Sequence, residues 1–349
     1  MRKIFLGLAA LCIIPGLLFP KKYPEGTIAS FLEIPTGREH GMFLTRYKLN
    51  SHYAARVHLM KILFILNPVS GNKSNDDAIL RIHQLAVDLP FDFKFCYTTG
   101  KNDESLILSE IEWYKPDRIV AGGGDGTLQL VARTIREMDT PLGVLPLGSA
   151  NGFATAIGMP KDPAAAVGIV VNATHTVPLD LLIFNNKHVC IHLGDIGINA
   201  RMVREYSQSE GRGMMAYAKH LMSSMKESEL LQYTIITPEQ TYHKEGYMLA
   251  FANANKYGTG IHISEGTVDD GRFEICNVPR IALDDAIKSG LTALNVFIDK
   301  NMFSDVISCE HAEIAISEKV HFQIDGEYMG MVDKLTVGIL PSSVPLLVA

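Results

Sequence analysis

The residues best suited to chemistry form a glycine-rich run from Gly122 to Thr127, with the sequence GGGDGT, between a predicted strand and a predicted helix. Consecutive glycines let a phosphate group approach the main chain closely. Their amides and the N-terminus of the following helix offer N–H donors and a positive dipole end to an anion. An acid inside such a loop, here Asp125, makes chemical sense when a metal ion bridges the negative charges. The run therefore predicts a phosphate-binding loop.

This run differs from the common nucleotide-binding motifs. The sequence contains no GxxxxGK[ST] motif, and Thr127 stands where GxGxxG has its third glycine. Protein-kinase signatures are also absent from the sequence. Taken alone, the glycines are also compatible with a tight strand-to-helix connection.

Two further polar, glycine-containing segments each follow a predicted strand. They are NPVSGNK at residues 67–73 and LPLGSANGF at residues 145–153. In a doubly wound sheet, the loops after the carboxyl ends of the strands line one crevice. We therefore expect three loops to converge on a nucleotide.

In this order and spacing, NPVSGN, GGGDGT and PLGSANGFA resemble the diacylglycerol kinase catalytic-domain family, which includes bacterial lipid kinases and the sphingosine and ceramide kinases. The resemblance covers about residues 60–349. It implies an α/β nucleotide-binding domain of the NAD kinase type and a β-sandwich domain from which the chain returns to the first. It also implies ATP lying across the glycine-rich loop. The ATP contacts carried over by position are Asn67, Ser70, Thr98, Gly122, Gly123, Gly124, Asp125, Gly126, Thr127 and Ser149.

Three acids receive catalytic roles from the resemblance. Glu327 belongs to a DGE sequence that matches a family motif, and it would accept the proton of the lipid hydroxyl. Asp125 would position Mg²⁺ or the reacting hydroxyl, and Asp180 would join the water network of the metal. One position departs from the family, because Gly152 stands where bacterial members often have Asp. Considered alone, Asp-Gly before Glu327 predicts a hairpin turn with a solvated glutamate.

The segment at residues 267–273, TVDDGRF, resembles the structural-metal loop of the same family. The resemblance implies that Asp270 binds Mg²⁺ through its side chain, and that Thr267 and Arg272 bind it through the backbone. Such oxygen ligands suit magnesium. An ordinary Asp-Gly hairpin turn is the alternative interpretation of this segment.

The hydrophobic pattern predicts two kinds of architecture. From Met60 onward, short apolar runs alternate with helical segments, which is typical of parallel strands with crossover helices. The expected strands are 61–66, 91–97, 118–121 and 142–145, and the expected helices are 76–88, 104–114 and 128–138. After Pro178, hairpin-like turns predict a mainly antiparallel part. Its expected strands include 179–184, 188–193, 335–340 and 344–348, with helices at 214–226 and 283–297.

These patterns, with the resemblance, predict three regions. We expect an N-terminal extension at 1–59, a nucleotide-binding α/β domain at 60–178, and a β-sandwich lipid-acceptor domain at 179–329. The strands at 330–349 would return to the α/β domain.

Charge and cysteine content exclude several classes of protein. A formal net charge of -6 argues against nucleic acid as the main partner. Five widely spaced cysteines without a CxxC pair disfavour a disulfide scaffold or a zinc site and favour the reducing cytosol. Residues 1–59 differ from the rest, because they hold eight Lys and Arg against three Asp and Glu. Their apolar start resembles a signal peptide or a membrane anchor, unless Met60 is the true start of translation.

These features together predict an ATP-dependent lipid kinase that uses Mg²⁺ at the inner face of the membrane. Its acceptor would be diacylglycerol or a related lipid such as a sphingoid base, and a homodimer would be compatible with this function. Two alternatives remain: an NAD kinase, which shares the GGDGT loop, and a non-catalytic lipid or nucleotide sensor, which the loss of an acid at Gly152 would allow. The sequence does not identify the acceptor, because apolar pockets discriminate weakly between similar chains.

Overall fold

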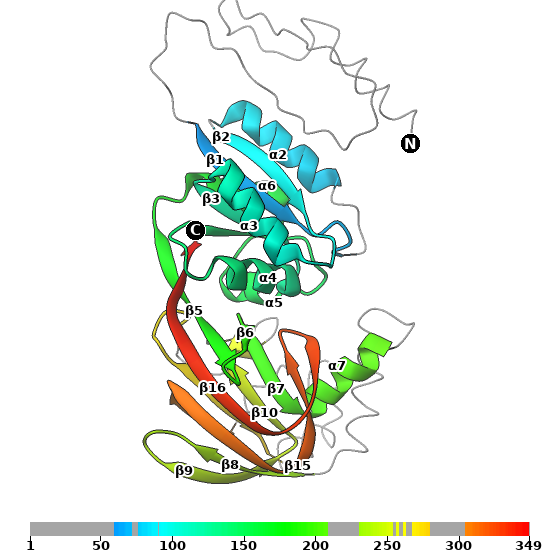
Figure 1. Ribbon diagram of the computed structural model, residues 1–349, viewed down its shortest axis with the longest axis vertical. Coiled ribbons are helices and arrows are strands. Elements are labelled where there is room, and N and C mark those ends of the chain that lie inside the picture. The colour runs from blue at the N-terminus through cyan, green and yellow to red at the C-terminus, as the bar shows by residue number, and fades with distance from the viewer. Residues whose placement is uncertain are drawn as a thin grey trace, which may run out of the picture. The chain divides into compact units, whose positions relative to one another are not determined.

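The computed structural model describes residues 59–71, 76–89, 91–208, 230–253, 256–257, 261–262, 267–279 and 304–348, all within the compact unit Leu59–Ala349 (Figure 1). The expectations for residues 1–58 and for helices at 214–226 and 283–297 fall outside these residues. Within them, no helix is both long and apolar enough to cross a membrane.

The first half is built on a parallel sheet, as the hydrophobic pattern predicts. Its strands are ordered β4-β3-β1-β2, and every pair between them is parallel. The strands are β1 (Met60–Leu66), β2 (Phe91–Tyr97), β3 (Arg118–Gly123) and β4 (Leu142–Pro146). The helices are α2 (Asp76–Asp88), α3 (Asp103–Tyr114), α4 (Asp125–Ile135), α5 (Gly152–Ala156) and α6 (Pro163–Asn172). Because β1, β3 and β4 are buried almost throughout, they are continuous apolar runs.

The second half is mainly antiparallel, which confirms the predicted change of architecture after Pro178. The main sheet contains β5 (Thr176–Phe184), β6 (His188–Cys190), β7 (Leu193–Gly197), β8 (Leu231–Ile236), β9 (Thr241–Gly246), β10 (Met248–Ala252), β13 (Phe273–Val278), β14 (Ser304–Cys309), β15 (His311–Ile324) and β16 (Glu327–Leu347). A small separate pair consists of β11 (Lys256–Tyr257) and β12 (Ile261–His262). Helix α7 (Ile198–Gln208) follows β7 directly.

Strand β16 connects the two halves. It pairs antiparallel with β15 and β5, and its end pairs in parallel with β4 through Leu346 and Leu142. The two strands expected at 335–340 and 344–348 are therefore one strand, which is interrupted by a bulge between Leu340 and Val344. The end of the chain thus pairs with the parallel sheet at Leu346, and the assignment of residues 330–349 to the α/β domain stays a prediction.

Each half has its own hydrophobic core. One core gathers β1 to β4, their helices and the end of β16, and the other gathers the sandwich strands around Phe184, Phe251 and Phe322. This two-part α/β and β-sandwich fold is the one expected from the sequence. The domain boundaries at residues 178 and 329 stay predictions.

Several sequence-based boundaries were wrong, and two of these differences have a clear physical reason. Helix α4 begins at Asp125 and not at Leu128, because Gly124 is its N-cap and an acid is favoured in the first turn of a helix. The strand expected at 188–193 is split into β6 and β7, since the amides of residues 191–193 bind the Asp325 carboxylate.

Candidate active site at the glycine-rich turn

The glycine-rich run forms a very short connection between β3 and α4. Gly122 and Gly123 end the strand, Gly124 caps the helix, and the remaining three residues form its first turn. A side chain at Gly123 would collide with the side chain of buried Thr127. The run therefore places a helix N-terminus directly at the carboxyl edge of the sheet, which is a favourable place for a phosphate group.

The other predicted loops meet at this edge. The Asn67 amide donates to the Gly122 carbonyl at 3.0 Å, and the Leu147 amide donates to the Gly123 carbonyl at 2.9 Å. The Ser70 hydroxyl donates to the carbonyl of Leu147 at 3.3 Å. The three polar loops thus form one continuous surface, as the sequence predicts.

The loops approach so closely that a glycine is required at position 148. A Cβ added to Gly148 would collide with the backbone of Gly124. Asn151 holds this loop, since its side chain accepts from the Gly148 amide at 2.9 Å and donates to the Gly148 carbonyl at 2.8 Å. Ser149, the predicted nucleotide contact beside Gly148, is exposed.

The predicted contact Thr98 lies at the end of β2, where its amide donates to the Leu66 carbonyl at 2.9 Å. The residues after it are held by Asp103, which the sequence analysis did not identify. Its carboxylate accepts from the Thr99 amide at 2.7 Å, the Thr99 hydroxyl at 2.9 Å and the Gly100 amide at 2.8 Å. Burial alone would raise the pKa of Asp103, but these hydrogen bonds lower it below its ordinary value. A detectable signal was the acid at the start of a helix just after Thr-Thr-Gly.

Asp125 joins two of the loops through its carboxylate. One oxygen accepts from the Gly152 amide at 2.9 Å, and the other accepts from the Phe153 amide at 3.0 Å. These are the first amides of α5, so Asp125 caps that helix from a distance in sequence. Gly152, the departure from the family pattern, thus supports the site through its main chain.

Glu327 comes from the sandwich and lies against the first turn of α4. A Cβ built on Gly126 would be 3.5 Å from Oε1 of Glu327. Asp325 and Gly326 form the two-residue turn between β15 and β16, and both have positive φ angles, 48° and 85°. Primed hairpin turns require such angles. The hairpin interpretation is therefore correct, and the same hairpin brings an exposed carboxylate to the glycine-rich turn.

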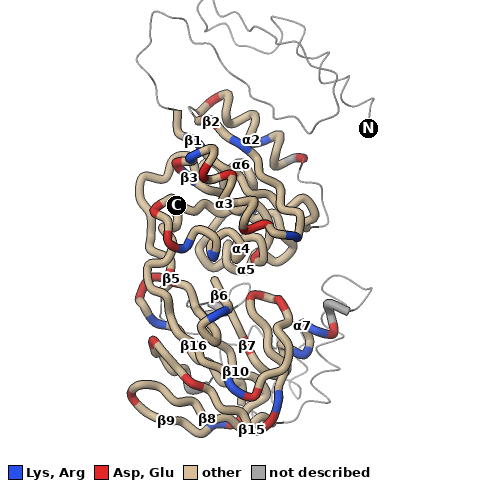
Figure 2. Tube along the Cα trace, viewed as in Figure 1, with Lys and Arg blue, Asp and Glu red and all other residues tan. Residues whose placement is uncertain are grey.

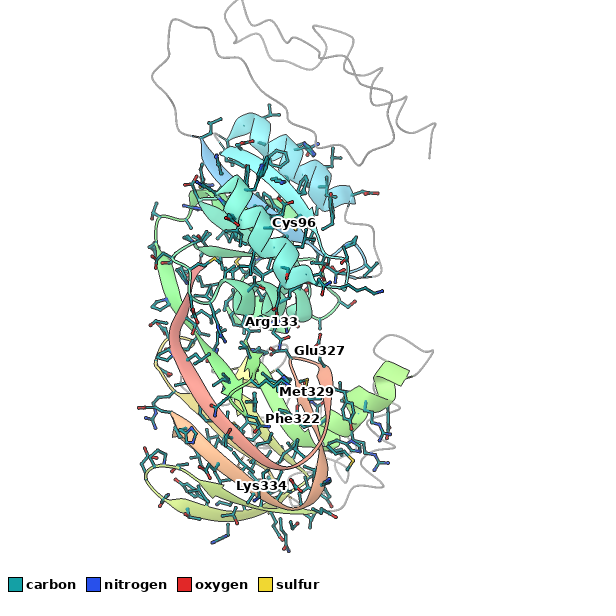
Figure 3. The ribbon with its side chains drawn as sticks, viewed as in Figure 1. Cys96, Arg133, Phe322, Glu327, Met329 and Lys334 are labelled. Carbon is teal, nitrogen blue, oxygen red and sulfur yellow. The ribbon has the colours of Figure 1, made fainter. Side chains whose placement is uncertain are left out.

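A polar recess of about 350 Å³ opens beside Glu327. It is lined by Glu104 of α3, by Gln129 and Arg133 of α4 and Arg136 just after it, by Lys187 and His188 at the β5–β6 hairpin, and by Glu327 and Met329. Figure 3 shows Arg133 near Glu327 and Met329, and Figure 2 shows the basic residues of α4 and of the β5–β6 hairpin in blue. Arg133 pairs with Glu104 at 2.5 Å, and Arg136 lies 3.7 Å from Glu137. The lining of the recess therefore carries three cations, Arg133, Arg136 and Lys187, and two carboxylates, Glu104 and Glu327.

Asp180 lies with the predicted metal loop. Its carboxylate accepts from the Gly271 amide at 2.7 Å and from the Ser342 amide at 2.6 Å. Burial raises the pKa of Asp180, these amides lower it, and the negative charges of Asp270 and Asp269 raise it again. The structure thus brings Asp180 together with the second group of predicted residues.

Asp270 shapes its own loop. Its carboxylate accepts from the Thr267 amide at 3.0 Å and from the Arg272 amide at 3.0 Å. The Arg272 side chain points elsewhere, because it donates to the Ser308 carbonyl at 2.6 Å and the Ser308 hydroxyl at 3.0 Å. Among the described residues, no group of three or more His, Cys, Asp or Glu forms a metal site.

The donor chemistry of this loop nevertheless suits Mg²⁺. Asp269, Asp270 and the buried Asp180 concentrate negative charge, and carboxylate and carbonyl oxygens are the ligands that this ion prefers. A divalent cation would neutralise that charge. The ligand roles of Thr267, Asp270 and Arg272 stay predictions.

Comparison with known proteins gives two adjoining matches. Residues 61–182 match the diacylglycerol kinase catalytic domain, and residues 195–348 match the YegS C-terminal NAD kinase beta sandwich-like domain. The chain belongs to the diacylglycerol kinase catalytic-domain family. The predicted resemblance is therefore confirmed, and it extends over both halves of the described structure.

Members of this family with related sequences come from several bacteria. The chain is 27% identical to "Probable lipid kinase YegS-like" from Klebsiella pneumoniae strain 342, over 76% of this chain and 88% of that protein. It is 24% identical to "Diacylglycerol kinase" from Bacillus subtilis strain 168, over 76% of this chain and 89% of that protein. A solved diacylglycerol kinase structure from Bacillus anthracis has a TM-score of 0.64 at 21% identity, covering 84% of this chain and 98% of that one. At this identity the structural likeness shows the fold alone.

Proposed function

We propose that this protein is a lipid kinase that transfers the γ-phosphoryl group of ATP to a hydroxyl of a glycerolipid such as diacylglycerol. The observation that carries the proposal is the position of Glu327 against the first turn of α4, at the end of the glycine-rich run. Membership of the family and the names of the relatives support the same function.

The helix N-terminus and the three loops would bind the triphosphate. Amides in the first turn of a helix lack partners within the helix, and the dipole there favours negative charge. Since Gly124 and Gly148 exclude side chains from the surface, a phosphate group could approach the main chain. Asn67, Ser70, Thr98 and Ser149 would contact the remainder of the nucleotide.

In the proposed reaction, the lipid hydroxyl oxygen forms a bond to the γ-phosphorus while the bond from that phosphorus to the bridging oxygen of the β-phosphate breaks. The hydroxyl proton passes to the Glu327 carboxylate, and ADP leaves with the bridging oxygen. Asp125 keeps the first turn of α4 and the start of α5 together during this step. Mg²⁺ bound with ATP near Asp125 would neutralise the phosphate charge.

The charge of the recess favours an uncharged acceptor over a sphingoid base. A sphingoid amine is cationic near neutral pH, and the recess would repel it because its three cations, Arg133, Arg136 and Lys187, outnumber the acids Glu104 and Glu327. Diacylglycerol has a hydroxyl and no charge. We therefore propose a glycerolipid acceptor and place the reaction at the cytoplasmic face of the membrane, where ATP is present.

The test is a turnover assay with the full chain, Mg²⁺ and γ-labelled ATP. Diacylglycerol in mixed vesicles, sphingosine in the same vesicles, and NAD in solution are compared at equal concentrations. We expect label in the product from diacylglycerol, and at least about tenfold less from sphingosine, corresponding to about 1.4 kcal/mol.

Each other outcome has a definite meaning. Label on NAD alone would establish the soluble-acceptor kinase instead. Absence of turnover with these acceptors and with a total bacterial lipid extract would contradict the kinase proposal and favour a sensor. Equal rates with diacylglycerol and sphingosine would keep the lipid kinase and overturn the argument from the recess charge.

A further inference from the structure

The segment from Val189 to Leu193, which joins β6 to β7, is bound from several sides. From the α/β half, the Gln129 amide group of α4 donates to the Val189 carbonyl at 2.8 Å, and this side chain is buried. The ring of Phe153 packs edge-on against His192, with centroids 6.0 Å apart. The segment is therefore attached to both helices that begin at the glycine-rich turn and its neighbouring loop.

The same segment is attached to the hairpin that carries Glu327. The Asp325 carboxylate accepts from three successive amides, those of Ile191 at 2.8 Å, His192 at 3.0 Å and Leu193 at 2.9 Å. The Asp325 amide in turn donates to the Leu193 carbonyl at 2.7 Å. One acid thus fixes the tip of the hairpin by four main-chain contacts.

We propose that Asp325 is a positioning residue for the proton acceptor Glu327, holding its hairpin onto the segment 189–193 and through Gln129 onto α4. The inference rests on the proposed function. Two links in series, Asp325 to residues 191–193 and Val189 to Gln129, set the distance between the Glu327 carboxylate and the phosphate-binding turn. Neither Asp325 nor Gln129 touches the reacting atoms in this proposal.

Geometry explains why an aspartate is needed at this position. A carboxylate offers only acceptors, so it can receive several N–H groups at once, whereas an amide group offers one acceptor oxygen. The turn position also requires a positive φ angle, which Asp and Asn tolerate. Asn at this position would therefore preserve the turn and could keep the contacts of His192 and Leu193 to Oδ1, but its NH2 group would face the Ile191 amide in place of the acceptor Oδ2.

Among the described residues, one titratable side chain donates to the Asp325 carboxylate. The Cys190 thiol lies 3.4 Å from Oδ1 of Asp325, and the remaining contacts are main-chain amides. Burial raises the pKa of Asp325 to about 6, although the amides and the thiol lower it. The Asp325 carboxylate consequently offers acceptors to all three amides of residues 191–193 only when it is ionised, which is the case above about pH 6.

The test compares D325N with the wild-type full chain in the labelled-ATP assay with diacylglycerol vesicles. We expect kcat to fall by about tenfold to a hundredfold, as a small misplacement of a catalytic group does. The Kd for ATP, measured by titration calorimetry, should change less than about threefold, because the phosphate-binding turn is intact. D162N is the matched control, since it removes a carboxylate that caps α6, and it should keep wild-type kcat.

A double-mutant cycle with E327D separates positioning from general destabilisation. If Asp325 acts through Glu327, D325N should lower kcat much less in the E327D background than in the wild type. Equal factors in both backgrounds would overturn the proposal, as would an unchanged kcat in D325N. Wild-type protein that phosphorylates no lipid would overturn the proposed function first, so the two failures are distinguishable.

A second variant covers the case in which D325N does not fold. Q129M removes the link on the α4 side and keeps a buried chain of similar length. Q129M should lower kcat because Glu327 is misplaced, and it should leave the Kd for ATP unchanged because the phosphate-binding turn is intact. A wild-type kcat in Q129M would show that the segment does not transmit position from α4 to Glu327.

Discussion

Asp103 and Asp325 each hold a loop by accepting hydrogen bonds from its amides, one in each half of the molecule, but their pKa values are shifted in opposite directions. Each carboxylate accepts hydrogen bonds from successive main-chain amides and shapes a loop beside the candidate site. The pKa of Asp103 is lowered, whereas the pKa of Asp325 is raised to about 6 because burial outweighs its hydrogen bonds. The balance between burial and hydrogen bonding decides the sign, since the hydrogen bonds prevail at Asp103 and burial prevails at Asp325.

The comparison separates two proposed functions of the site, nucleotide binding near Asp103 and proton transfer near Asp325. The largest expected effect comes from Glu327 itself. E327Q should reduce kcat by about a thousandfold or more, since the amide accepts no proton. The Kd for ATP should stay near the wild-type value, as measured by calorimetry. Lipid phosphorylation at the normal rate in E327Q would remove Glu327 from the chemistry.

A smaller effect of a different kind is expected for Asp103. D103N should loosen the turn after Thr98 and weaken ATP binding by about tenfold, because a carboxylate with three contacts becomes a single acceptor. At saturating ATP, kcat should stay within about twofold of the wild type. The comparison fails if D103N lowers kcat and leaves ATP affinity intact, which is the pattern expected of D325N.

The smallest effect concerns stability, and the two acids should differ in its pH dependence. Because the folded protein raises the pKa of Asp325, the protonated carboxyl group favours the folded state, and it does so fully at pH values below its ordinary pKa of 3.8. This contribution to the free energy of unfolding is lost as the pH rises through about 6. From pH 5 to pH 7, the wild type should lose about 1 kcal/mol relative to D325N. Asp103, with its lowered pKa, contributes fully above its ordinary value, so the difference between wild type and D103N should stay constant.

Urea unfolding of the three proteins at pH 5, 6 and 7 measures these differences. The wild type serves as the common reference, so that changes from other groups cancel. A constant difference for D325N over this range would show that its carboxylate is ionised at pH 5 in the folded protein. A sloping difference for D103N would contradict the lowered pKa.

Local features of the sequence predicted much of the α/β half. The bounds of α2 and β2 agree with the structure at every residue, since each is a single periodic segment with clear ends. The polar loops were found because each follows an apolar strand. Helix α6 was missed, although Asp162 before Pro163 is a strong helix-start signal.

Features of the second half that depend on distant partners could not be predicted. Asp325 has an ordinary turn sequence, and nothing near it in the chain indicates that residues 191–193 are its hydrogen-bond partners. The same is true of Asp180, whose partners Gly271 and Ser342 lie on separate segments. For Glu327, the turn and the candidate catalytic role were treated as competing interpretations, yet the structure supports the turn and leaves the role open to experiment.

The continuity of β16 has a consequence for how the protein is made. Leu142 of β4 finds its parallel partner in Leu346, which the ribosome adds only after all the sandwich strands of the described structure. The β4 edge of the parallel sheet therefore stays uncovered during most of synthesis, and long-range pairing of this kind slows folding. Separately expressed halves cut near residue 178 would lack this pairing, because the final strand of the first half would be encoded in the second.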